Sequence, residues 1–137
     1  MQGRSFLDSN VLLYTDDLDE ATKRQQALDL LSELMGLGTA VISTQVLQEY
    51  FNIATHKLHV PIALARSKVE IFSRLHLVPI GLPTILGATE LVEMHSVSFW
   101  DALIIQAAHE AGCERLYSED LQNGRRFQSL VIVNPFL

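Results

Sequence analysis

Four acidic residues of this chain, Asp8, Glu49, Asp101 and Asp120, each lie where a predicted strand ends or a predicted helix begins. In a parallel α/β sheet such positions converge at one edge, outside the carboxyl ends of the strands, where ligands bind. Carboxylates gathered in one place repel each other unless a cation compensates their charge. The sequence therefore predicts a magnesium-type metal site that acts on phosphodiester bonds.

Short apolar runs alternate with longer helical patterns along the chain. The runs predict strands at 4–7, 40–43, 77–80, 115–118 and 130–133. The helical patterns lie at 21–37, from Thr44, from near Pro61, at 84–94 and from Ser98. Strands that alternate with helices indicate a three-layer α/β/α sandwich with a central parallel sheet of four to five strands. We see no repeat or linker, so a single domain over residues 1–137 is expected.

Composition narrows the class of protein. The chain has 137 residues, of which 48% are hydrophobic and 19% charged, as expected of a compact globular domain. It has no apolar run of membrane-spanning length and no signal-like start, and its single cysteine, Cys113, cannot form an internal disulfide. We therefore expect a cytoplasmic protein with no membrane partner. The net charge of −6 disfavours nucleic-acid binding unless bound metal or a basic cluster reverses the charge locally.

Two of the acidic residues also have simple structural interpretations. Asp8 is followed by a serine and Asn10, a combination that is typical of a turn after a strand. As a metal ligand, Asp8 would stand at a strand end with Asn10 in support. A glutamate in a helix is by default solvated, but Glu49 lies one helical step from Val46 and Ile53, on an otherwise apolar face.

The other two acidic residues stand beside capping residues. Ser98 and Asp101 form a capping-box pattern, in which the carboxylate helps the helix to begin. Apolar residues one turn later also place Asp101 near the buried side, where a carboxylate without a cation is costly, and we favour a functional role. Either Ser118 or Asp120 could instead cap a short helix at 121–127. Each residue alone is a weak signal, and the prediction rests on the set.

Blocks spread over nearly the whole chain resemble, in order, the PIN-domain proteins, particularly the VapC-type toxins of bacterial toxin–antitoxin pairs. The blocks are FLDSNVL at 6–12, STQVLQE at 43–49, SFWDALI at 98–104, YSEDLQNG at 117–124 and VNPF at 133–136. The opening motif alone is weak, but the blocks together, at family-like spacing, are fairly specific.

The resemblance implies a metal-dependent endoribonuclease, the toxin of a type II toxin–antitoxin system. It implies Mg²⁺ or Mn²⁺ as the cofactor, a single-stranded or structured RNA such as tRNA as the substrate, a small antitoxin protein as a partner, and a homodimer. By this likeness Asp8, Glu49, Asp101 and Asp120 form the acidic quartet, with Asn10 and Ser118 in support. We expect Asp8 and Asp101 to be the principal ligands, Glu49 to hold a water or act as base, and Asp120 to act through water.

Two other classes of protein could also explain parts of this sequence. A phosphotransferase of the aspartyl-phosphate type also begins with an aspartate after its first strand, but it needs a second acid two residues later, where this chain has Asn10. It also needs a lysine near a later strand end, and the sequence offers no convincing one. The stronger alternative is a non-catalytic module of the same fold that binds protein or RNA, against which the intact acidic set argues.

Overall fold

The computed structural model describes residues 3–137, and Met1 and Gln2 lie outside it. Its sheet has six strands in the order β3-β2-β1-β4-β6-β5. The strands are β1 (Ser5–Leu7), β2 (Ala40–Ser43), β3 (His76–Val78), β4 (Arg115–Tyr117), β5 (Arg126–Phe127) and β6 (Leu130–Val133). The five parallel strands confirm the predicted sheet, and the two-residue strand β5, which pairs antiparallel with β6, adds one edge.

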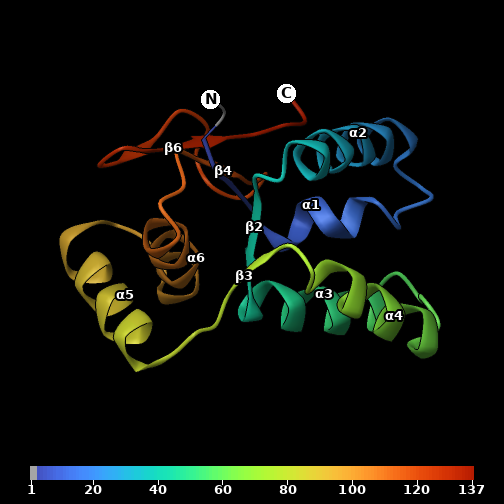
Figure 1. The fold of residues 1–137 in the computed structure, drawn as a ribbon, viewed down its shortest axis with the longest axis horizontal. Coiled ribbons are helices and arrows are strands. Elements are labelled where there is room, and N and C mark those ends of the chain that lie inside the picture. The colour runs from blue at the N-terminus through green and yellow to red at the C-terminus, as the bar shows by residue number, and fades with distance from the viewer. Residues whose placement is uncertain (1–2) are drawn as a thin grey trace.

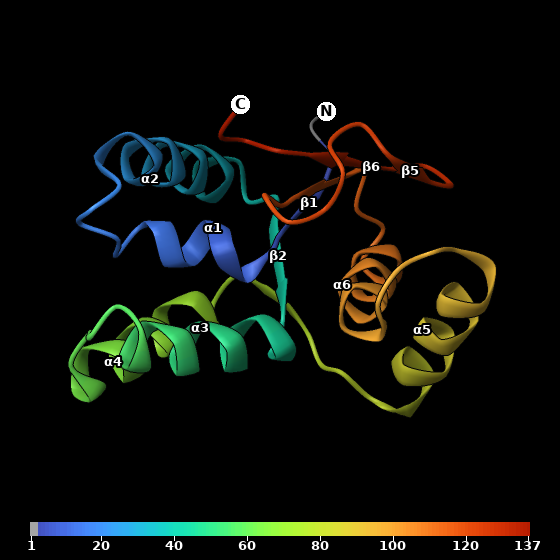
Figure 2. The same cartoon turned by 180° about the vertical axis from the view of Figure 1, so that it is seen from behind.

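Helices cover both sides of this sheet (Figures 1 and 2). They are α1 (Ser9–Tyr14), α2 (Ala21–Leu37), α3 (Thr44–His56), α4 (Ile62–Phe72), α5 (Leu82–Met94) and α6 (Phe99–Glu110). The ribbon shows α1 to α4 on one side of β2 and the pair α5 and α6 on the other. The expected three-layer α/β/α sandwich is therefore confirmed.

Strand β1 occupies the centre of the sheet between β2 and β4. Phe6 lies opposite Val41 of β2 and Leu116 of β4, and all three side chains are fully buried. Such continuous apolar runs are what a parallel sheet covered on both faces requires. Because β1 and β4 are parallel neighbours, the residues that follow them, Asp8 and Ser118, are brought to the same edge.

Short polar side chains begin two of the helices that lead away from this edge. The Asp8 side chain accepts a hydrogen bond from the backbone N–H of Ser9 and caps α1. Ser43 caps α3 by accepting from the N–H of Val46, a bond worth about 1 kcal/mol to the helix. The hydroxyl of Thr44, the first residue of α3, instead accepts from the N–H of Ile80 and ties α3 to the segment after β3.

The segment after β4 differs from the expectation of a short helix at 121–127. It forms bends and a turn and then strand β5. Gly124 stands in the left-handed region at a φ of 85°, and its N–H donates to the carbonyl of Ile132 at 2.8 Å. The interpretation of Asp120 as a helix cap is therefore wrong, since the helix is absent. Among residues 3–137, none of the helices combines the length and apolar character needed to cross a membrane.

Candidate functional site

Asp8 is the buried centre of the predicted site, with 6% of its surface exposed. Its Oδ1 accepts from the N–H of Ser9 at 2.7 Å, and its Oδ2 accepts from the hydroxyl of Ser118 at 2.7 Å. The second bond joins the residues that follow β1 and β4, which are 110 positions apart in the chain. The carboxylate is thus held in one orientation from two sides.

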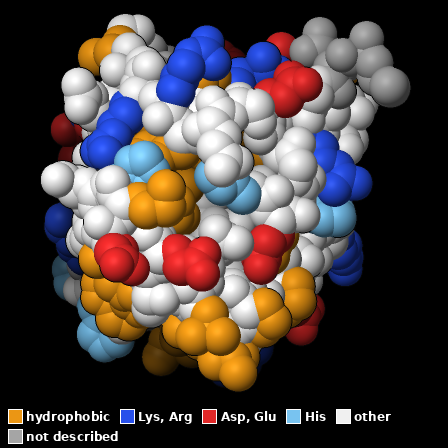
Figure 3. Space-filling model, turned by 90° about the vertical axis from the view of Figure 1, so that its left-hand side faces the viewer, with side chains coloured by type: hydrophobic (Ala, Val, Ile, Leu, Met, Phe, Trp, Pro, Cys, Tyr) orange, Lys and Arg blue, Asp and Glu red, His pale blue; other side chains and the backbone are white. Residues whose placement is uncertain are grey.

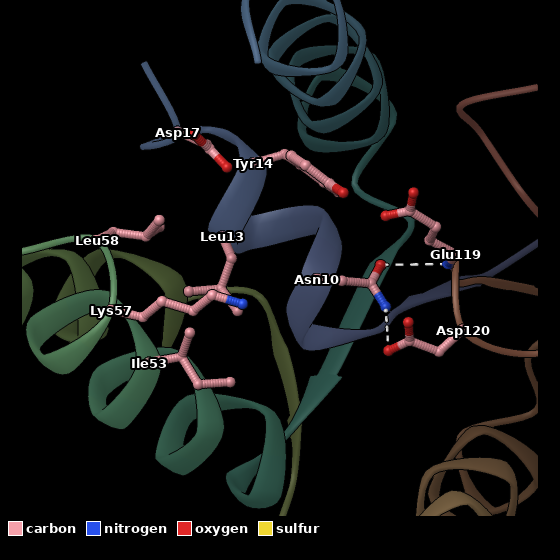
Figure 4. A pocket seen from close by; sticks show the side chains of 9 residues that line it. All are labelled: Asn10, Leu13, Tyr14, Asp17, Ile53, Lys57, Leu58, Glu119 and Asp120. Atoms are coloured by element: carbon pink, nitrogen blue, oxygen red, sulfur yellow. Dashed lines mark hydrogen bonds between the residues drawn. The ribbon is translucent and has the colours of Figure 1, made fainter. Parts of the chain in front are cut away.

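Asn10 connects this buried carboxylate to Asp120. Its Nδ2 lies 3.4 Å from Oδ2 of Asp8, 3.5 Å from Oγ of Ser118 and 3.2 Å from Oδ2 of Asp120. Its Oδ1 accepts from the N–H of Glu119 at 3.3 Å (Figure 4). The Ser118 hydroxyl accepts in turn from the N–H of Asp120 at 3.2 Å. Both predicted supporting residues therefore contact the predicted acids.

Glu49 and Asp101 approach from α3 and α6. Glu49 is half-buried on α3, and the nearby side chains of Ser9 and Gln45 act to lower the pKa of its carboxyl. Asp101 is partly buried in the first turn of α6, and its backbone N–H donates to the hydroxyl of Ser98 at 3.1 Å, as the capping pattern predicted. The Asp101 side chain stays close enough to Glu49 for their charges to interact.

The four carboxylates of the site lie close enough for their charges to influence one another. Burial raises the pKa of Asp8 to about 6, against the lowering effect of its bonds to Ser118 and Ser9, and the charges of Glu49 and Asp120 raise it further. Burial likewise raises the pKa of Glu49, and the charges of Asp101 and Asp120 add to that rise. Each of the four carboxylates therefore interacts with at least one of the others.

The side chains as they lie do not form a finished metal centre. Within residues 3–137, no three Asp, Glu, His or Cys side chains are close enough together to hold an ion. The chemistry of the donors nevertheless fits Mg²⁺ or Mn²⁺: all four are hard carboxylate oxygens, and the buried Asp8 carries a charge that a cation would compensate. Asp8, Glu49, Asp101 and Asp120 are the groups that would hold it.

Gln45 is a residue of this site that the sequence analysis did not single out. Its side chain is buried, with 6% of the residue exposed, and its Nε2 donates to the carbonyl of Trp100 at 3.2 Å, which links α3 to α6 beside Asp101. Its Oε1 is buried without a hydrogen-bond partner among residues 3–137. Its place one helical turn before Glu49 was the only available signal, because glutamine has no charge to draw attention.

A second missed group holds the segment that carries Asp120. Lys23 of α2 donates to Oε1 of Glu119 at 2.5 Å and lies over the ring of Tyr14, 5.1 Å from its centroid. Its Nζ is also 3.4 Å from the Tyr14 hydroxyl. Glu119 is therefore engaged in an ion pair, and Asp120 is the acid whose side chain accepts from Asn10.

Comparison with known proteins identifies the protein family. The family model of the PIN domain matches residues 5–126, and the chain belongs to the PIN domain family. This confirms the family that the sequence blocks resembled.

Two solved structures share this fold. VapC20 of Mycobacterium tuberculosis, described as a sarcin-ricin loop cleaving toxin, is 17% identical with a TM-score of 0.63, and the match covers 85% of this chain and 89% of that one. VapBC2 of Rickettsia felis, bound to a DNA fragment from its promoter, is 21% identical with a TM-score of 0.68, and the match covers 93% and 96%. A search of curated protein sequences finds no significant match.

Proposed function

We propose that the protein is a metal-dependent endoribonuclease, the toxin of a type II toxin–antitoxin system. One observation carries the proposal: Asp8, buried at the end of the central strand, interacts with acids from α3 and from the segment after β4 at one edge of the sheet. Membership of the PIN domain family and the fold shared with VapC toxins support the same activity. The substrate class we propose is RNA, either tRNA or another structured RNA.

We assign a separate role in phosphodiester hydrolysis to each residue of the site. A bound Mg²⁺ or Mn²⁺ would offset the negative charge of the phosphodiester and of the leaving oxygen. Asp8 and Asp101 are the groups we assign to hold the ion, with Asp120 acting through water. Glu49, whose pKa is raised by burial, is suited to orient the attacking water and take its proton as the P–O bond to the leaving oxygen breaks. Ser118 and Asn10 keep Asp8 and Asp120 oriented.

A small antitoxin protein and a second copy of the chain are the partners we propose. The VapBC2 structure of similar fold supports the first. Support for the homodimer comes from large apolar side chains exposed on the α5 and α6 side, since exposed apolar patches mark association surfaces. Figure 3 shows hydrophobic side chains gathered along the lower edge of this side, and Leu82, Leu86 and Trp100 are all more than half exposed.

We propose the cytoplasm, where RNA is found, as the location.

The test is cleavage of an RNA panel that includes total tRNA, with Mg²⁺, with Mn²⁺ and with chelator. The wild type should cut at least one RNA only when metal is present. Asp8→Asn should reduce the rate by roughly two orders of magnitude or more, because several kcal/mol of transition-state stabilisation depends on the metal. Asp19→Asn is the matched control, since Asp19 is exposed and lies outside the acidic set.

Two results would count against the proposal. Full activity of Asp8→Asn, or of the wild type in chelator, would exclude metal-dependent cleavage at this site. Metal binding by the wild type without cleavage of any RNA in the panel would favour the alternative, a non-catalytic PIN-fold module that binds protein or RNA.

A further inference from the structure

We propose that the pocket next to the acidic residues binds one unpaired nucleobase of the RNA and favours bases with an amino group over uracil. The inference rests on the proposed function, because it assigns the substrate-binding subsite of that same site. It adds a basis for sequence preference that the acidic residues cannot supply, since they act on the phosphodiester that every nucleotide shares.

The pocket opens between α1, the end of α3 and the segment after β4 (Figure 4). Its volume is about 200 Å³. Pockets for drug-sized ligands span about 300–1,000 Å³, so this one admits a single flat ring system and excludes a base pair. Asn10 and Asp120 form one side of it, and Asn10 also reaches Asp8. A base in the pocket would thus lie beside the phosphodiester to be cut.

Apolar and aromatic side chains form the walls. Leu13 of α1, Ile53 of α3 and Leu58 line the pocket together with the ring of Tyr14. Figure 4 shows Leu13 in the middle, with Ile53 and Leu58 on one side of it and the side chain of Tyr14 pointing the other way, toward Glu119. The ring of Tyr14 is held by Lys23 on one side and packs edge-on against Phe136, with centroids 4.8 Å apart. Such surfaces accept the faces of a splayed-out base.

The polar groups of the pocket are rich in hydrogen-bond acceptors. Asp17 uses Oδ1 to accept from the N–H of Asp19 at 3.1 Å, and neither Asp17 nor Asp120 has a cationic partner among residues 3–137. Ionised carboxylates can only accept. Guanine, adenine and cytosine present an exocyclic amino group that donates. The N3–H donor of uracil instead stands between two carbonyl oxygens, which repel a carboxylate that approaches it. The pocket therefore discriminates against uracil.

The lining also offers one cation that could contact a backbone phosphate. The third acid of the lining, Glu119, is already paired with Lys23. Lys57, which also lines the pocket, is exposed and has no carboxylate partner among residues 3–137. Its ammonium suits a backbone phosphate next to the bound base.

The test measures binding apart from cleavage. The wild-type protein, in EDTA, is titrated with GMP, AMP, CMP and UMP while the methyl NMR signals of Leu13, Ile53 and Leu58 are followed. We expect the three amino-bearing nucleotides to shift these signals, each with a Kd roughly tenfold lower than that of UMP. Ile53→Trp, which fills the pocket, should abolish the shifts of the Leu13 and Leu58 signals, with its fold checked by circular dichroism.

Two variants separate base recognition from phosphate binding. Asp17→Asn supplies a donor as well as an acceptor, so the preference over UMP should shrink, with Asp120 keeping part of it. Lys57→Gln should weaken all four nucleotides by a similar factor and keep the preference, because phosphate contacts carry no base information. Asp19→Asn, outside the pocket lining, should leave both the affinities and the preference unchanged.

Several results would overturn the subsite. They are UMP binding as tightly as GMP, no shift of the pocket methyls with any nucleotide, and a preference that Asp17→Asn does not reduce. Shifts produced only by an arginine-rich peptide would instead assign the pocket to a protein partner. Nucleotide binding in the pocket with no cleavage of any RNA would contradict the proposed nuclease activity and support the subsite. Cleavage of RNA without nucleotide binding in the pocket would support the nuclease activity and contradict the subsite.

Discussion

The hydroxyl of Ser118 donates to the carboxylate of Asp8 at 2.7 Å, and both residues are buried where two neighbouring strands end. This bond lowers the pKa of Asp8, while burial and the nearby acids raise it. The same hydroxyl accepts from the backbone N–H groups of Asp120 and Leu121. Ser118 therefore controls the charge of one acid and the position of another.

Replacing Ser118 tests this double role. Ser118→Ala should raise the pKa of Asp8 further and move the acidic limb of the cleavage profile to higher pH, because the ionised form loses a donor. It should also lower the free energy of unfolding by roughly 1–3 kcal/mol, since buried partners are left unsatisfied. Ser118→Thr, which keeps the hydroxyl, should preserve the pH profile. An unchanged acidic limb in the alanine variant would refute the role.

Asp8 should make the metal-free protein less stable as pH rises. Its pKa is about 6 in the folded protein against a reference value of 3.8, so the folded state holds the proton more tightly between these values. The free energy of unfolding should therefore fall from pH 4 to pH 6 by up to roughly 3 kcal/mol on account of this residue, and then level off.

Urea unfolding in EDTA measures this contribution. Asp8→Asn should match the wild type near pH 4 and be more stable at pH 7.5, and the difference between the two curves isolates Asp8 from other titrating groups. The amide keeps an acceptor for the N–H of Ser9, so the cap of α1 survives. Parallel curves for the two proteins between pH 4 and 7.5 would show that Asp8 has an ordinary pKa.

Metal binding should compete with the proton on Asp8. Above about pH 6 the carboxylate is ionised and the apparent Kd for Mn²⁺ should change little with pH on its account. Below about pH 6, each fall of one pH unit should raise the apparent Kd by up to about tenfold, because metal binding then displaces one proton from Asp8. Calorimetric titration at pH 7.5, 6.5 and 5.5 in buffers of different ionisation enthalpy gives both the Kd and the protons released. Proton release at pH 5.5 equal to that at pH 7.5 would contradict the assignment.

Tyr50, the neighbour of Glu49 on α3, anchors this helix to the end of α1. Its hydroxyl donates to Oδ2 of Asp16 at 2.5 Å, and Lys68 of α4 pairs with Oδ1 of the same carboxylate. The Asp16 side chain is only 8% exposed, so Tyr50→Phe should lower the free energy of unfolding by roughly 1–3 kcal/mol.

Chemical denaturation of matched variants checks the role of Tyr50. Tyr117→Phe is the control, since the Tyr117 hydroxyl has no hydrogen bond within the described part of the chain, and it should change stability by less than about 0.5 kcal/mol. Each of the two variants removes one phenolic hydroxyl group from a tyrosine. Equal effects of both would mean that the bond to Asp16 contributes nothing.

The sequence predicted the sheet well because its buried strands are short, continuous apolar runs. Helix α1 was missed because six residues are too few to show a helical period, and its cap, Asp8, was interpreted only as a turn or a ligand. The helix expected at 121–127 failed because the turn at Gly124 and pairing with β6 outweigh the local helix-start signal of Ser118.

The candidate site was predictable only in part. The positions of Asp8, Glu49, Asp101 and Asp120 followed from strand ends and helix starts, and their roles as ligands stay a prediction. Gln45 was not predictable, because its importance comes from burial against the carbonyl of Trp100, a contact between residues 55 positions apart. The ion pair of Lys23 with Glu119 is likewise a product of tertiary packing, which local patterns do not encode.

The place of β1 between β2 and β4 has a consequence for the order of events during synthesis. During synthesis, β1 acquires its second neighbour only when residues 115–117 have emerged. Asp120 follows a few residues later, so a nascent chain lacks the complete acidic set until the segment after β4 has been made.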